Sequence, residues 1–249
     1  MTTLEEYNSY GEDLERIMRL RTLPIAVKML EKEEDIPEGA IRPEKDRGIH
    51  IAQCQAFAMS RREGATVAML KEDNWCFAPL IAYGLVDPPD DEDIKRFTSF
   101  PRFERGKYVG IVTAPLIKAT FEPDLVLIYS NTTQLRDMLY PSHLAGKEAK
   151  VNSHFFPPSC SYTIIPVLSS GEYLVALPDP GEHMRAMSGE DEIILSVPKV
   201  KMEELMSGIL KSKERRLTST GNPRMMQHDF TQPELYQRLF KRWGLSPEK

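Results

Sequence analysis

The sequence lacks three features that would place it in a common functional class. It has no run of the roughly 18 to 20 apolar residues that a membrane-spanning helix needs. It carries 32 lysines and arginines against 37 aspartates and glutamates, so its net charge of −5 provides no basic excess for nucleic acid. No G-x-G-x-x-G or P-loop pattern is present. We therefore expect neither a membrane protein, nor a nucleic-acid-binding protein, nor a dinucleotide-binding enzyme.

Cysteine is scarce as well. The chain has three, Cys54, Cys76 and Cys160, and no two of them form a C-x-x-C pair. The first residues are acidic and include no apolar stretch, which is unlike a secretory signal. An odd number of cysteines without such a signal fits a reducing cytoplasm, where thiols stay free or bind metal. We expect a cytoplasmic protein.

The apolar pattern predicts an α+β fold with a mixed β-sheet flanked by helices. Periodic apolar residues predict helices within residues 3–20, 50–62, 134–139 and 201–211. Short apolar runs predict strands at 23–30, 65–70, 107–113, 124–129, 174–177 and 192–197. We expect residues 1–212 to form one domain that carries the three cysteines, and residues 213–249 to form a linker and a last helix.

Cys76 occupies the most informative local pattern. A predicted strand at 65–70 leads through a polar turn to Trp75, Cys76 and Phe77, and Pro79 follows. Proline is tolerated best in the first turn of a helix, so a helix should begin near Phe77. Cys76 would then lie at the positive end of that helix, where a thiolate is stabilised. This position favours a reactive or ligating cysteine over a packed one.

Three cysteines suit a cluster that keeps one metal position open. Thiolates are the usual ligands of iron–sulfur clusters, whereas a closed tetrahedral zinc site needs four ligands. We expect Cys54, Cys76 and Cys160 to hold a [4Fe–4S] cluster whose remaining iron binds a small ligand or substrate, as a Lewis acid or a redox centre. His50, Trp75 and Arg185 are the expected neighbours of that ligand.

Other interpretations stay open. His50 lies four residues before Cys54, so on a helix the two would share a face and could bind zinc, for which His154 is also available. A cysteine with His50 or His183 as its base would be a thiol nucleophile. The cysteines could equally be packed core residues of a non-redox small-molecule-binding or regulatory module.

Residues 179–185 form a further candidate segment between two predicted strands. The segment holds charged groups and a glycine. We expect a loop there, either a solvated hairpin loop or an anion site that uses Arg185.

Several short segments together suggest a family. In chain order, they are Pro24–Lys28, Gln53–Ala56, Trp75-Cys76 with Tyr83–Leu85, Pro123–Leu127, Ser159–Ser161 and Glu192–Pro198. This ordered set, over roughly residues 12 to 212, resembles the domain of unknown function 169 family of prokaryotic proteins.

The resemblance implies a single cytoplasmic domain with Cys54, Cys76 and Cys160 at a shared site. It also implies that many relatives carry a further cysteine before the glycine of the loop that here reads Pro178-Asp179-Pro180-Gly181. This chain lacks that cysteine, which leaves an open coordination position or Asp179 in its place. The helix faces that bear methionines and aromatic residues would suit a homo-oligomer.

Overall fold

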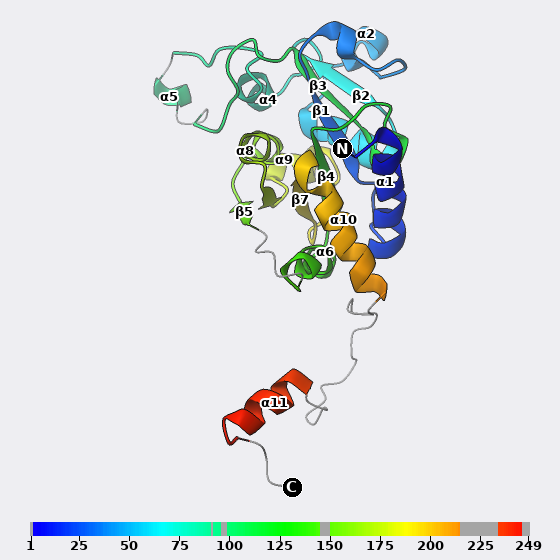
Figure 1. Ribbon diagram of the computed structural model, residues 1–249. Coiled ribbons are helices and arrows are strands. Elements are labelled where there is room, and N and C mark those ends of the chain that lie inside the picture. The colour runs from blue at the N-terminus through cyan, green and yellow to red at the C-terminus, as the bar shows by residue number, and fades with distance from the viewer. Residues whose placement is uncertain (1, 91, 96–98, 145–149, 215–233, 246–249) are drawn as a thin grey trace. The chain divides into compact units, whose positions relative to one another are not determined.

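The computed structural model describes residues 2–90, 92–95, 99–144, 150–214 and 234–245. The chain divides into two compact units, Met1–Thr218 and Ser219–Lys249. The described residues of the first unit form a seven-stranded sheet with helices packed on it (Figure 1). This architecture confirms the predicted α+β class. Within the described ranges, no helix has both the length and the apolar character needed to cross a membrane.

The sheet is mixed and mostly antiparallel, in the order β2-β3-β1-β4-β7-β6-β5. Neighbouring strands run antiparallel except β5 and β6, which are parallel. The strands are β1 (Ile25–Leu30), β2 (Val67–Leu70), β3 (Gly110–Pro115), β4 (Leu125–Ser130), β5 (Val151–His154), β6 (Tyr173–Ala176) and β7 (Ile193–Pro198). The six predicted strands are buried along most of their length, which explains their apolar runs. The more exposed β5 has no such run and was not predicted.

Side chains of the inner strand β1 alternate between two hydrophobic cores. Ile25, Val27 and Met29 contribute to one core, and Ala26 and Leu30 to the other. The second core is covered by α1 (Leu4–Met18), α6 (Thr132–Leu144) and α10 (Lys199–Glu214). The first core is covered by α3 (Gln53–Ala58), α4 (Phe77–Ala82), α7 (Ser159–Tyr162) and α8 (Ile165–Ser170).

The first helix shows how local sequence signals fix these elements. Thr3 caps α1 by accepting a hydrogen bond from the Glu6 N–H, and Glu6 accepts one from the Thr3 N–H in return. Gly11 lets the helix approach the chain after β3 closely, since a Cβ there would lie 2.7 Å from the Ile117 nitrogen. The helix therefore packs where a larger residue would collide with backbone.

The structure corrects three local predictions. No element was predicted within residues 31–48, but this segment contains α2 (Pro43–Arg47), which starts with a proline at its first position. The helix predicted at 50–62 begins only at Gln53 and continues into a π-helical turn, Met59–Glu63, that ends at Gly64. Residues 179–185 are not a loop, because Asp179 caps the helix α9 (Pro180–Arg185).

The remaining elements are short. Two are 3₁₀ helices, Glu33–Asp35 and Leu116–Lys118. The others are α5 (Glu92–Lys95) in the first unit and α11 (Glu234–Arg242) in the second. Residues 215–233 of the predicted linker lie outside the described residues.

A cysteine-lined pocket as the candidate functional site

The fold brings all three cysteines to one cavity of about 280 Å³. Cys54 and Cys160 are 9% and 7% exposed, Cys76 is half-buried, and all three are free thiols. The cavity is lined by residues of four separate segments: Ala52, Gln53 and Cys54; Cys76, Phe77 and Ala78; Pro157, Pro158, Ser159 and Cys160; and Asp179, Pro180, Gly181 and Arg185. The cysteines, far apart in the sequence, thus share one site.

A short backbone pairing holds the Cys54 and Cys76 segments together. The Ile51 N–H donates to the Asp73 carbonyl at 3.0 Å, and the Trp75 N–H donates to the Ile51 carbonyl at 3.3 Å. These bonds form an isolated parallel bridge just before both cysteines. The positions of Cys54 and Cys76 are therefore set by the same pair of segments.

The turn before Cys76 is fixed by the fully buried carboxylate of Asp73. Its Oδ2 accepts hydrogen bonds from Arg42 Nε at 2.7 Å and from the Leu70 N–H at 2.8 Å. Its Oδ1 accepts from the Glu44 N–H at 3.0 Å. A buried carboxylate with three donors holds its surroundings in one arrangement. The chain then enters α4 with Cys76 as the N-cap, which confirms the predicted start of that helix.

Three further hydrogen bonds fix the Cys160 segment. The Tyr83 hydroxyl, at the end of α4, donates to the Cys160 carbonyl at 3.1 Å. Asp179 accepts from the Ser159 N–H at 2.9 Å and the Ser159 hydroxyl at 3.0 Å, while it also accepts from the Glu182 N–H and caps α9. Cys160 is therefore tied both to the helix that follows Cys76 and to the helix that carries Arg185.

The electrostatics of the pocket keep the thiols protonated when no cation is bound. Burial raises the pKa of Cys54 to about 12, and the carboxylates of Glu182 and Asp179 act in the same direction. Burial also raises the pKa of Cys76, although the Ala78 N–H and Arg185 oppose it. Burial, together with the neighbouring Cys76 and Asp179, raises the pKa of Cys160. A bound metal would reverse this preference, because a coordinated thiol is deprotonated.

Arg185 places a positive charge at the wall of the cavity. Its guanidinium carbon lies 4.8 Å from the centre of the Trp75 ring, a cation–π contact. Its Nε is buried and has no hydrogen-bond partner. No ion pair is found between Arg185 and any other described residue. The structure thus places Arg185 in the lining and Trp75, also an expected neighbour, directly against it.

Gln53 is a polar residue of the lining that our sequence analysis did not single out. Its side chain is 1% exposed, and neither its amide oxygen nor its amide nitrogen has a partner. Leaving such groups unpaired costs free energy, so each one calls for an explanation. Gln53 directly precedes Cys54, and this adjacency was the sequence signal that could have identified Gln53 as part of the site.

The described histidines do not join the site. His50 precedes Ala52, the N-cap of α3, so the predicted helical pairing of His50 with Cys54 is wrong. Its Nδ1 instead lies 2.7 Å from the Glu72 carbonyl. The His154 ring stacks on Tyr162, and His183 is exposed with its Nδ1 3.0 Å from the Ser188 carbonyl. None of these three histidines lines the cavity.

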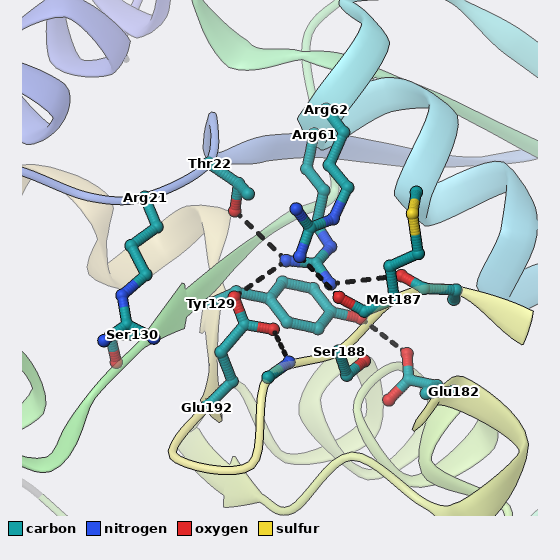
Figure 2. Close-up of polar contacts among 12 residues, drawn as sticks. Arg21, Thr22, Arg61, Arg62, Tyr129, Ser130, Glu182, Met187, Ser188 and Glu192 are labelled. Carbon is teal, nitrogen blue, oxygen red and sulfur yellow. Dashed lines mark hydrogen bonds and ion pairs between the residues drawn. The ribbon is translucent and has the colours of Figure 1, made fainter. Parts of the chain in front are cut away.

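Figure 2 shows a buried polar network around Arg61. The Arg61 guanidinium, 1% exposed, donates to Glu192 Oε1 at 3.0 Å, to the Thr22 hydroxyl at 3.2 Å and to the Ala186 carbonyl at 3.4 Å. It also lies 4.0 Å over the Tyr129 ring. Each member is a single polar residue in a different segment, so the sequence held no pattern that would group them.

The network reaches the pocket through Glu182. The Tyr129 hydroxyl donates to Glu182 Oε1 at 2.6 Å, and the Ser159 hydroxyl lies 3.1 Å from Glu182 Oε2. Burial raises the pKa of Glu182 to about 7, against the opposing effects of Tyr129, Ser159 and Arg61. The Ser159 hydroxyl faces both Glu182 and Asp179 but has one hydrogen, so it can donate to only one of them. If Glu182 is protonated and donates to the Ser159 hydroxyl, that hydroxyl can donate to Asp179. The side chains of Glu182, Ser159 and Asp179 then all have hydrogen-bond partners.

Comparison with known proteins bears on the predicted family. A family model described as "Uncharacterised ArCR", DUF169, matches residues 13–208. The chain belongs to the DUF169 family. No curated protein and no solved structure matches it.

In this DUF169 member, Asp179 lines the pocket and is engaged in hydrogen bonds. Oδ2 accepts from Ser159, and Oδ1 accepts from the Glu182 N–H. Among the described residues, no group of three or more His, Cys, Asp or Glu side chains is arranged to hold a single metal ion. Three thiols and an already bonded carboxylate are therefore the donor set of the pocket.

Proposed function

We propose that this DUF169 protein is a cytoplasmic iron–sulfur protein in which Cys54, Cys76 and Cys160 hold a [4Fe–4S] cluster. One observation carries the proposal: three free thiols from three separate segments line one cavity. The cluster would leave one iron free for a small ligand or substrate, because the chain supplies three thiolates and Asp179 is engaged elsewhere.

Support for the proposal comes from the kind of donor present and from the size of the cavity. Thiolates are the protein ligands that iron–sulfur clusters use. A cavity of about 280 Å³ has room for a group of many atoms, since one water occupies about 30 Å³ in the liquid. Arg185 would offset the net negative charge of a [4Fe–4S]²⁺ core with three thiolates. Because the thiols favour protonation in the empty pocket, binding should also release protons.

When bound, the group would supply an iron that polarises a ligand oxygen as a Lewis acid. The chain itself would do the remaining work. Arg185 and Gln53 would orient the ligand, and the apolar lining would limit access of water. The Glu182–Ser159–Asp179 chain would hold a proton beside the site.

The test is anaerobic purification with iron and sulfide analysis and a visible spectrum. We expect about four irons per chain and the broad visible absorbance of thiolate-bound iron. Cys54→Ser, Cys76→Ser and Cys160→Ser should each lose most of the iron. Val167→Ala is the matched control, because Val167 is buried in the same core as Cys160 and its truncation should weaken the fold without removing a ligand.

Two results would contradict the proposal. A protein that stays colourless after anaerobic reconstitution would leave zinc or packed thiols in a non-redox small-molecule-binding module. Full iron content in all three serine variants would show that the metal binds elsewhere. Light scattering on the same preparation measures the oligomeric state and so tests the predicted homo-oligomer.

A further inference from the structure

The unpaired amide of Gln53 restricts what can complete the pocket. A primary amide offers two donors on nitrogen and an acceptor on oxygen, and neither atom of Gln53 has a partner. If the amide oxygen and nitrogen of Gln53 exchanged places, both atoms would still need a hydrogen-bond partner. Cluster sulfides can only accept, so the oxygen of the amide would still lack a donor. The group that completes the site must therefore include a hydrogen-bond donor.

Arg185 adds a second requirement. Arg185 lines the same cavity, its guanidinium lies against Trp75, and its buried Nε has no partner. Guanidinium groups match carboxylates with two parallel hydrogen bonds. A carboxylate would satisfy the Nε and the charge together. The other polar side chains of the lining, Ser159 and Asp179, are already bonded to each other.

We infer that the ligand of this pocket is a small 2-hydroxycarboxylate, with its carboxylate on Arg185 and its hydroxyl on Gln53. The hydroxyl donates to the amide oxygen and can accept from the amide nitrogen. A hydroxyl fits better than an ammonium group, because a second cation would stand in the same cavity as Arg185. The inference rests on the proposed function, since the ligand would occupy the position that three cysteines leave open.

The experiment is a calorimetric titration of the cluster-loaded protein with glycolate, with acetate and glycine as comparison probes. Acetate keeps the carboxylate but lacks the hydroxyl, and glycine replaces the hydroxyl with an ammonium group. We expect glycolate to bind about tenfold or more tightly than either, since one hydrogen bond to a charged or buried group accounts for a factor of this size. The visible spectrum should change with the same saturation curve.

Two variants test the assigned residues. Arg185→Gln and Gln53→Met should each weaken glycolate binding about tenfold or more, measured per loaded cluster in preparations matched for iron content. Gln53→Met should also leave the thermal midpoint of the ligand-free protein equal or higher, because it removes unpaired polar atoms. If Gln53 had only a structural role, Gln53→Met would instead lower this thermal midpoint. Arg21→Gln is the control arginine change, because Arg21 is exposed, pairs with Asp191 and lies outside the cavity lining.

The outcomes separate the inference from the proposed function. A protein with full cluster content that shows no binding of glycolate, or equal binding of acetate, overturns the inference alone. Tighter binding of glycine than of glycolate does the same and points to an amino acid. A protein that holds no cluster overturns the proposed function, and the inference with it.

Discussion

The Tyr129 hydroxyl donates a 2.6 Å hydrogen bond to Glu182 in a region that solvent does not reach. The same ring lies under the Arg61 guanidinium, so one aromatic side chain joins a buried cation to a buried carboxyl group. Because this carboxyl group is buried, its protonation changes the free energy of unfolding.

Glu182→Gln should change how stability depends on pH. The pKa of Glu182 is about 7 in the folded state and near 4.5 when the chain is unfolded, so the folded state binds the proton more tightly between these values. The contribution of Glu182 to stability should be largest below about pH 4.5 and should fall by on the order of 3 kcal/mol as the pH rises to about 7. The glutamine variant should lack this loss. Urea unfolding of both proteins at several pH values measures the difference, and Glu31→Gln is an exposed control. A difference between variant and wild type that does not change with pH would contradict the prediction.

Arg61→Met should strongly destabilise the protein. It leaves Glu192 buried without its partner, and breaking a buried ion pair in this way costs about 3 to 5 kcal/mol. The neighbouring Arg62 is exposed, so Arg62→Met should cost less than about 1 kcal/mol. Replacing the partner as well, in Arg61→Met with Glu192→Leu, should recover part of the loss. Equal unfolding free energies for the two single arginine variants in denaturant would refute a structural role of the pair.

The three thiols should react at different rates in the metal-free protein. Burial raises the pKa of Cys54 to about 12, which lowers its thiolate fraction about a thousandfold relative to an ordinary cysteine. Cys76 is less buried, and the Ala78 N–H and Arg185 favour its thiolate. Iodoacetamide should therefore label Cys76 first, with Cys54 and Cys160 following slowly, as measured by peptide mass spectrometry. In urea all three should react alike, and a folded protein that labels them equally would show that the pocket is not closed.

Asp179 should stabilise the pocket through two separate roles. Asp179→Ala removes the cap of α9 and leaves the Ser159 N–H without its acceptor, which together should cost about 2 to 4 kcal/mol. Asp179→Ser can still cap the helix but cannot reach Ser159, so it should lose about half as much. Asp191→Ala, which removes an exposed ion pair, should have a smaller effect. If the serine variant were as stable as the wild type in thermal unfolding, the bond to Ser159 would have no role.

Local sequence signals were sufficient for most of the sheet and for the start of α4. Strands such as β4 and β7 are buried on both faces and read as continuous apolar runs. Pro79 and the polar turn before Cys76 fixed the beginning of α4. By contrast, Asp179 and Pro180 are good starting residues of a helix, but the surrounding Pro-Asp-Pro-Gly sequence also matches a turn. Local chemistry did not decide between these two structures.

The composition of the pocket depended on contacts that no local pattern contains. His50 stands outside α3 because Ile51 pairs with the Asp73–Trp75 segment instead of continuing the helix. The partners of Glu182 come from β4 and from the start of α7, and only the packed sheet brings them together. The cysteines could be identified as a set, but the residues that orient them could not.

The four segments that line the cavity lie between residues 52 and 185 of the chain, and β7 extends the sheet to residue 198. During synthesis, a ribosome that has released only the residues through β4 presents two of the three thiols and none of the α7 and α9 residues that complete the wall. The cavity exists only after the second half of the domain has emerged and folded. Loading of any group into this pocket therefore requires that the chain through α9 has emerged and folded.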